Sequence, residues 1–310
     1  MTTCRIQHLR RPLDAAELTR SLAHPGGLWQ EIAVARRTGS TNADLMARAR
    51  DGAPEGVVLA AEEQTAGRGR LGRSWVSPPR AALTFSLLVR PHRVPPARRS
   101  WLPLLAGVAT ATAVREATGL HAALKWPNDV MVGERKLAGI LAEQPGNAGR
   151  PGDAVIVGVG INVSMRREEL PPAGRGSLAA TSLLLEGSAS LDRERLLRGV
   201  LAEFERWYLP WCAAAGEAGA GPVAVQAADA TGQAADAAGQ AAGDPEGRRS
   251  LRQAYLSLCS TLGRDVRVEL PGGRLLSGAA VDVDCEGRLV VRAGSAGSVA
   301  VAAGDVAHVR

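Results

Sequence analysis

The sequence is poor in lysine and asparagine, and this scarcity marks a small set of positions. Only two of its 37 basic residues are lysines, Lys125 and Lys136. Arginine serves wherever a plain positive charge is sufficient, so a retained lysine indicates a place where a compact ammonium group is needed. Asparagine occurs only four times, as Asn42, Asn128, Asn147 and Asn162. We therefore expect a functional site near the two lysines.

Long apolar runs, a signal peptide and paired cysteines are also lacking. The longest apolar run, residues 101–114, is short for a bilayer and contains a proline and threonines, so it predicts a buried helix. Residues 1–14 contain no apolar signal core, and the four cysteines have no metal-binding or redox spacing. These absences favour a cytoplasmic protein that is not bound to a membrane.

The positive charge is spread along the whole chain. The net charge is +6, but no run of basic residues alternates with aromatic ones, which is the pattern typical of nucleic-acid-binding surfaces. We interpret most arginines as ordinary solvated surface charges, and we predict no binding to DNA.

One basic segment is concentrated, GRGRLGRSW at residues 67–75. Its glycines have the spacing of a dinucleotide-binding turn, which must pass directly from a strand into a helix. A buried strand is predicted before it, at 56–64, but Pro78 and Pro79 prevent a helix from starting after it. We therefore interpret the segment as a mobile loop that holds an anion, with a solvated basic loop as the alternative.

The remaining pattern predicts an α+β protein with two folded parts. Strands and hairpins alternate irregularly with helices up to residue 212, without the regular βαβ order of a parallel sheet. Residues 213–249 are mostly small or polar, with no apolar side chain larger than valine, so we expect a disordered insertion. A helix follows at 250–262, and residues 263–310 alternate like the short antiparallel strands of a small barrel.

Four further segments combine polar side chains with positions where the backbone turns. They are TGSTN (38–42), KWPND (125–129), KLAGIL (136–141) and GVGIN (158–162). Taken alone, each has a structural interpretation, namely a helix cap, a strand-ending turn, a strand edge and the glycine-rich end of a buried strand. The neutral donors and acceptors of the first segment also suit an uncharged polar ligand, such as a ureido or amide group.

In this order, and together with Q-x-A-GRGRxGR-x-W, these motifs resemble those of the biotin protein ligases. The resemblance covers roughly residues 34–212 and the terminal barrel. It implies an α+β catalytic domain, with a central mixed β-sheet and flanking helices, followed by a small SH3-like barrel. The expected division is a catalytic domain at 1–212, an insertion at 213–249, a helix completing the catalytic domain at 250–262, and the barrel at 263–310.

The resemblance also implies an activity. Biotin protein ligases use ATP and Mg²⁺ to activate biotin as biotinyl-5′-AMP. They then transfer it to a lysine of the biotin carboxyl carrier protein, or carrier domain, of an acyl-CoA carboxylase. A lipoate or octanoate protein ligase is the alternative, although those enzymes lack the GRGRxGR loop and the KWPND pairing. Only 37 residues precede TGSTN, so we expect a short form without the helix-turn-helix of bifunctional ligase-repressors.

The resemblance assigns roles to individual residues. Lys136, Arg68 and Arg70 are the expected catalytic residues, because they would hold the negative oxygens of the biotin carboxylate and the adenylate. The expected biotin- and adenylate-binding set is Ser40, Thr41, Asn42, Gln64, Arg68, Gly69, Arg70 and Lys136. The expected nucleotide-binding set is Lys125, Asn128, Asp129 and Asn162, with Mg²⁺ arriving with ATP and no protein ligand assigned to it. No adenine-stacking residue is predicted, because residues 177–187 contain no tryptophan.

Overall fold

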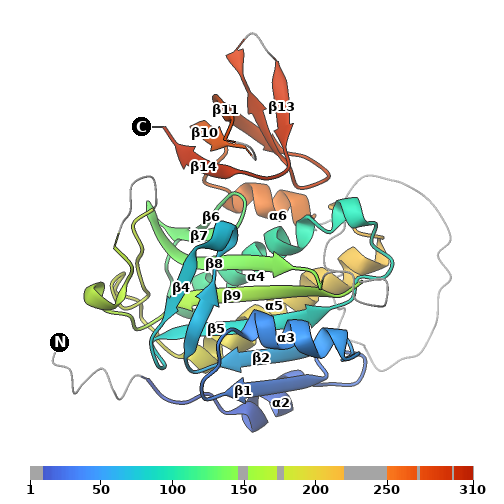
Figure 1. Cartoon of the computed structure of the whole chain (residues 1–310), viewed down its shortest axis with the longest axis vertical. Helices are drawn as coiled ribbons and strands as arrows, with labels where there is room; N and C mark the ends of the chain where they lie inside the picture. Colours follow the sequence, from blue (N-terminus) through green and yellow to red (C-terminus); the bar gives the residue numbers. More distant parts are fainter. Residues whose placement is uncertain are drawn as a thin grey trace, which may run out of the picture.

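A computed structural model describes residues 10–145, 153–172, 178–219, 250–270, 273–294 and 297–309. It contains a larger part built on a central sheet and a smaller C-terminal barrel, which lies above the sheet in Figure 1. Among the described helices, none has the length and apolar character needed to span a membrane.

Seven strands form the central sheet, in the order β1-β2-β5-β9-β8-β7-β6. Their bounds are Glu31–Ala35 (β1), Val57–Ala61 (β2), Ala82–Val89 (β5), Val155–Asn162 (β9), Arg135–Glu143 (β8), Asp129–Val132 (β7) and Ala122–Lys125 (β6). Only β1 and β2 pair in parallel, and the other neighbours are antiparallel. The predicted mixed sheet is therefore confirmed.

Helices cover both faces of this sheet, because its strands are apolar on both sides. Val58 and Ala60 face the main core, which includes α2 (Ala15–Leu22), α4 (Trp101–Thr118), α5 (Arg193–Ala213) and α6 (Leu251–Leu258). Val57 and Leu59 face the opposite side, where they pack under α3 (Thr41–Arg50), drawn in front of the sheet in Figure 1. The 101–114 run lies in α4, which is buried as expected.

The glycine-rich basic segment forms a hairpin separate from the sheet. Strand β3 (Gln64–Arg68) pairs with β4 (Ser74–Ser77), and a 3-10 turn at Arg70–Gly72 joins them. The backbone N–H of Gly69 donates to the carbonyl of Arg73 at 2.7 Å and closes the turn. The prediction that no helix follows the glycines is confirmed, but the hairpin itself was not predicted.

Five antiparallel strands form the C-terminal barrel, in the order β13-β12-β11-β10-β14. Their bounds are Asp265–Glu269 (β10), Leu275–Val283 (β11), Leu289–Arg292 (β12), Ser298–Val301 (β13) and Asp305–His308 (β14). Alternate residues such as Val266 and Val268 are fully buried, which is why the two-residue alternation of the sequence predicted strands here.

The predicted insertion is only partly described. Residues 213–219 belong to the described structure, where Ala218 is buried and its carbonyl accepts a hydrogen bond from the backbone N–H of Arg252 at 2.9 Å. The described first part therefore continues past residue 212 to residue 219. Residues 220–249 lie outside the described residues, so the prediction of a disordered insertion stays a prediction.

Candidate active site

A cavity of about 640 Å³ lies between the central sheet, the β3–β4 hairpin and the barrel. A pocket of this size suits a ligand as large as a small nucleotide conjugate. All twelve residues that the sequence assigned to biotin, adenylate or nucleotide line it: Ser40, Thr41, Asn42, Gln64, Arg68, Gly69, Arg70, Lys125, Asn128, Asp129, Lys136 and Asn162. The fold therefore brings together segments that lie far apart in the sequence.

One end of the cavity is a network of neutral polar groups, which we call the neutral end. The Gln64 Oε1 atom accepts hydrogen bonds from the backbone N–H and the hydroxyl of Thr41, at 2.8 and 3.0 Å. Ser86 Oγ lies 2.7 Å from the Thr41 hydroxyl and donates to Asn42 Oδ1 at 2.6 Å. The Asn42 amide donates to Glu143 Oε2 at 2.7 Å, which fixes the orientation of that amide.

Glycines in the sheet make the room that this end needs. A Cβ atom on Gly158 would lie 2.2 Å from Asn42 Oδ1, and one on Gly160 would lie 2.4 Å from the indole ring of Trp75. These are closer than any real contact, so a side chain at either position would displace its neighbour. The glycines of GVGIN therefore admit the side chains of Asn42 and Trp75 to the sheet surface.

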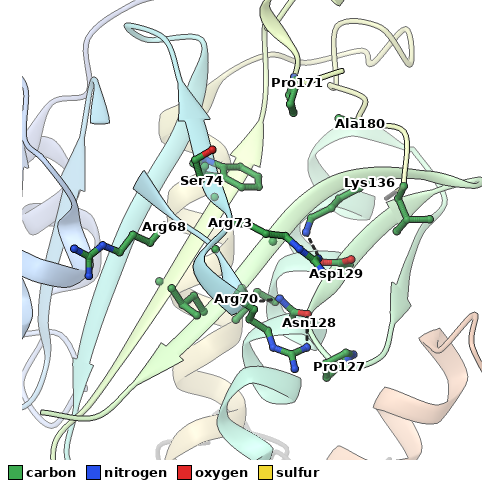
Figure 2. A pocket seen from close by; sticks show the side chains of 18 of the residues that line it. Arg68, Arg70, Arg73, Ser74, Pro127, Asn128, Asp129, Lys136, Pro171 and Ala180 are labelled. Atoms are coloured by element: carbon green, nitrogen blue, oxygen red, sulfur yellow. Dashed lines mark hydrogen bonds and ion pairs between the residues drawn. The ribbon is translucent and has the colours of Figure 1, made fainter. Parts of the chain in front are cut away.

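The opposite end carries charged groups, and we call it the charged end (Figure 2). Lys136 Nζ lies 2.5 Å from Asp129 Oδ1. Arg70 donates to Asn128 Oδ1 at 3.2 Å and to the carbonyl of Gly304, in the barrel, at 3.3 Å. The hairpin, the sheet and the barrel thus meet at this end of the cavity.

The three arginines of the hairpin point in different directions. Arg73 forms an ion pair with Asp305 of the barrel, and Arg70 reaches toward Asn128. The side chain of Arg68 is exposed and extends away from both of them in Figure 2. In this arrangement Arg73 lies beside the Lys136–Asp129 pair and Arg70 beside Asn128, whereas Arg68, which also lines the cavity, is the exposed one of the three.

The KWPND segment is anchored to the barrel. The backbone N–H of Trp126 donates to Thr261 Oγ1 at 3.1 Å, and its indole N–H donates to the carbonyl of Gly287 at 3.0 Å. Lys125 is buried and donates to the carbonyl of Val306. Burial lowers the pKa of Lys125; Asp129 opposes this shift, and the nearby cations add to it. The segment is both a strand-ending turn and part of the cavity wall.

Asn162, at the end of GVGIN, is buried and holds a neighbouring segment. Its amide donates to the carbonyl of Thr181 at 2.8 Å, and its backbone carbonyl accepts from Leu183 at 3.0 Å. Asn162 therefore lines the cavity while its amide fixes the wall formed by the chain around residue 181.

The cavity has an excess of positive charge, which fits a polyanion such as the ATP triphosphate. Its lining contains six cationic and three acidic side chains: Arg68, Arg70, Arg73, Lys125, Lys136 and Arg267 against Asp129, Glu269 and Asp305. Within the described ranges, no cluster of three or more metal-ligating side chains occurs. Mg²⁺ commonly binds through phosphate oxygens, water and one or two carboxylates. Asp129 fits that limited role.

Several residues of the site were not predicted from the sequence. Ser86 lies behind the cavity lining, where it supports Thr41 and Asn42; the one signal that could have found it is a hydroxyl two residues after Thr84 on the same face of a mostly apolar strand. Trp75 was part of the motif but had no assigned role. The barrel residues Gly304 and Asp305 gave no sequence signal, because their part in the site depends on how the two parts pack.

The comparisons with known proteins agree with this geometry. Residues 34–162 match the Biotin/lipoate A/B protein ligase family, and residues 261–309 match the Biotin protein ligase C terminal domain. A biotin--[acetyl-CoA-carboxylase] ligase of Mycobacterium tuberculosis is 40% identical over 308 residues, which is 97% of this chain and 98% of that relative. The bifunctional ligase/repressor BirA of Bacillus subtilis is 37% identical over 160 residues, covering 52% of this chain and 48% of that relative.

The fold is also similar to that of a solved structure. A biotin protein ligase from Aquifex aeolicus, in complex with biotin and ATP, has a TM-score of 0.66 and 24% identity. The match covers 91% of this chain and 100% of that one, and at this identity the likeness is one of fold. The stronger finding is 40% identity along almost the full length of a relative. On that ground, and with both parts matched, the chain belongs to the biotin protein ligase family.

Proposed function

We infer that the protein is a biotin–[biotin carboxyl-carrier protein] ligase. It activates biotin with ATP as biotinyl-5′-AMP and transfers the biotinyl group to a lysine of the carrier protein or domain of an acyl-CoA carboxylase. The observation that carries this proposal is one cavity with a neutral end and a charged end. The full-length similarity to a biotin ligase supports it. A cytoplasmic location, predicted from the sequence, is part of the same proposal.

The neutral end favours biotin over lipoate. The ureido ring of biotin offers two N–H donors and one carbonyl acceptor. The hydroxyl and amide groups of Thr41, Asn42 and Gln64, which line the cavity, can both donate and accept, and Ser86 behind them holds Asn42 in place. The dithiolane ring of lipoate has no comparable polar groups. A site built to hydrogen-bond a polar ligand rejects an analogue that leaves its buried groups unpaired.

The first step joins two anions, and the charged end reduces their repulsion. A carboxylate oxygen of biotin attacks the α-phosphorus of ATP, the new C–O–P linkage forms, and the bond to pyrophosphate breaks. Lys136, Arg70 and Arg73 are cations that can hold the carboxylate and phosphate oxygens together. Bound Mg²⁺ would neutralise charge on the phosphates, with Asp129 as the carboxylate that fits it.

The second step is attack of a neutral lysine amine of the carrier on the carbonyl carbon of the adenylate. The C–N bond forms, the bond to AMP breaks, and the carbonyl oxygen becomes negative in the transition state. The cations of the charged end are suited to stabilise that oxygen, and no protein nucleophile is needed. The hairpin covers the cavity by bridging the sheet and the barrel, which limits loss of the adenylate to water.

ATP–pyrophosphate exchange with a panel of acids tests the proposal. Purified protein with MgATP should exchange pyrophosphate with biotin and not with lipoate or octanoate, and it should then label an isolated carrier domain. Exchange with lipoate or octanoate would instead support the alternative ligase. No exchange with any acid would contradict the activity itself.

A further inference from the structure

A buried ion pair lies at the base of the β3–β4 hairpin, outside the cavity. Arg193 begins α5, and Glu62 lies in the short link between β2 and β3. The two residues are 4% and 6% exposed, and Arg193 Nη2 lies 2.6 Å from Glu62 Oε2. Neither residue is part of the cavity lining, so catalysis by direct contact does not explain the pair.

Stability alone is a poor reason for this pair. Removing two charges from water costs about as much as their attraction returns, and apolar residues of similar volume are often equally stable. Burial lowers the pKa of Arg193, and its Nε atom has no hydrogen-bond partner among the described residues. Arg193 also lies in the first turn of a helix, where the helix dipole disfavours a cation. A role in positioning explains it better.

Glu62 connects the base of the hairpin to the rest of the molecule. Its carboxylate accepts from the backbone N–H of Leu13 at 2.6 Å as well as from Arg193. Its backbone N–H donates to the carbonyl of Ala35 at 2.9 Å, and its carbonyl accepts from the N–H of Arg80 at 2.7 Å. Because Glu62 and Arg80 flank the hairpin, this one residue holds both of its ends.

The same N-terminal segment also holds a second wall of the cavity. Arg10 donates to both carboxylate oxygens of Glu169, at 2.7 and 3.1 Å, and to the carbonyl of Ser164 at 2.9 Å. Glu169 lies beside Pro171, which lines the cavity and is seen above the hairpin in Figure 2. Arg193 further donates to the carbonyl of Arg11 at 2.5 Å. Residues 10–13 thus connect the hairpin base to this wall.

A small rotation at the base would matter at the tip. Backbone bonds to Thr38 and Gly39 hold the hairpin as far as Ala66, and beyond that point side chains make its links to the sheet and the barrel. The part of the hairpin beyond Ala66, from Gly67 to Arg70, spans about 13 Å at about 3.3 Å per residue, so a rotation of about 10° at its base moves its end by about 2 Å. A displacement of about 1 Å is enough to impair catalysis.

We propose that Arg10, Glu62 and Arg193 form a brace that sets the position of the hairpin against the wall at 163–172. The brace thereby controls how long the acyl adenylate stays enclosed. These are positioning residues, because they act through Arg70 and Arg73 of the hairpin and do not touch the substrate. The part of the inference that concerns the adenylate rests on the proposed function, whereas the part that concerns hairpin placement does not.

Limited trypsin digestion provides the test, since the hairpin carries three arginines. Cleavage after Arg68, Arg70 and Arg73 is followed by mass spectrometry, with and without biotin and MgATP, in wild type, Arg10→Gln and the double variant Glu62→Gln/Arg193→Met. The control is Arg99→Gln, which removes an arginine side chain that is 10% exposed and paired with Asp153, away from the cavity. Melting temperatures and adenylate release rates are measured for all four proteins.

In both brace variants, trypsin should cut the ligand-free hairpin roughly tenfold faster than in wild type. Both should also release the adenylate roughly tenfold faster. Each tenfold change corresponds to a loss of about 1.4 kcal/mol in the free energy that holds the hairpin in place. Arg99→Gln should match wild type in both rates even if its melting temperature falls equally. Wild-type cleavage and release rates in both brace variants would overturn the proposal. If the double variant does not fold, Arg10→Gln, whose side chain is 17% exposed in wild type, decides alone.

The brace and the proposed function can be contradicted separately. If wild type forms no adenylate from biotin and MgATP, the proposed function is contradicted, and the ligand-free cleavage rates still decide whether the brace exists. If wild type forms the adenylate and the brace variants are cut and release it at wild-type rates, the proposed function is supported and the brace is excluded.

Discussion

The two ends of the cavity are built in different ways. At the neutral end, Thr41, Asn42 and Ser86 are buried, bonded to one another and carried by a helix start and a central strand. At the charged end, Arg70 and Arg73 come from a hairpin and reach groups of the sheet and the barrel. The neutral end is therefore formed before a ligand binds, whereas the charged end depends on three elements coming together. Selectivity and retention are thus assigned to different parts of the molecule.

The largest expected effect is at Lys136, where the charged end meets the sheet. Lys136→Met should lower the rate of biotin-dependent ATP–pyrophosphate exchange by roughly 10²–10³-fold, because it removes a positioned cation from the reacting oxygens. The matched control is Arg135→Gln, one residue earlier on the same strand, whose exposed side chain pairs with Glu186. Exchange reduced equally in both variants would mean that the strand, and not the ammonium group, is responsible.

The hairpin arginines should differ in how well they retain the adenylate. Arg70→Ala loses its bonds to Asn128 and Gly304 and should release biotinyl-adenylate roughly 10–100-fold faster, because hydrogen bonds of charged groups contribute about 1.5–3 kcal/mol each. Arg68→Ala should have a smaller effect in this arrangement. The measurement is the off-rate of the adenylate, together with labelling of lysines on bystander proteins. A larger effect at Arg68 would show that the hairpin turns this side chain inward on binding.

The neutral end should affect binding more than turnover. Ser86→Ala removes the donor to Asn42 and should raise KM for biotin roughly tenfold with kcat nearly unchanged, since a buried acceptor is left unpaired. Ser77→Ala is the control, because the hydroxyl of this buried serine makes no hydrogen bond in the part of the chain that the structure describes. A fall in kcat at constant KM would contradict a preformed binding end.

The smallest expected effect is on the pH dependence of stability, through His308 of the barrel, which lies near Lys125. Burial, with Lys125 and Arg264 nearby, lowers the pKa of His308 to about 4 from an ordinary value near 6.5. Between these values the unfolded chain binds more protons at this histidine, so its contribution to stability is present above pH 6.5 and is lost as the pH falls toward 4. His308→Asn should therefore flatten the fall in melting temperature over this range. An unchanged slope would place His308 in a more solvated setting.

Much of the fold and of the candidate site was predictable from the sequence, for identifiable reasons. Strands β5 and β9 are mostly apolar, and α3 begins at a serine cap, so local patterns defined them. The twelve residues predicted for the site came from ordered motifs, and all twelve line the cavity. The scarcity of lysine and asparagine marked the same neighbourhood, because only a few positions require those side chains.

The other features of the fold and the site depend on contacts that no local sequence pattern encodes. The β3–β4 hairpin has glycines and exposed residues in place of an apolar alternation, so it was interpreted as a loop. Asp305 pairs with Arg73 across more than two hundred residues, and Arg10 pairs with Glu169 across 159. Such pairs appear only once the two parts are packed, which is why the barrel face of the cavity and the brace were missed.

The contacts of the β13–β14 turn have a consequence for synthesis of the protein. Translation proceeds from the N-terminus, and domains generally fold as units in that order. The neutral end is made by the start of α3, by Gln64 of β3 and by the central sheet, all of which precede the barrel, so a growing chain can complete it early. The charged end lacks the partners of Arg70 and Arg73 until Gly304 and Asp305 have been made. An unfinished chain would thus be able to recognise biotin before the groups that enclose the adenylate are in place, so retention of the adenylate depends on completing the C-terminal barrel.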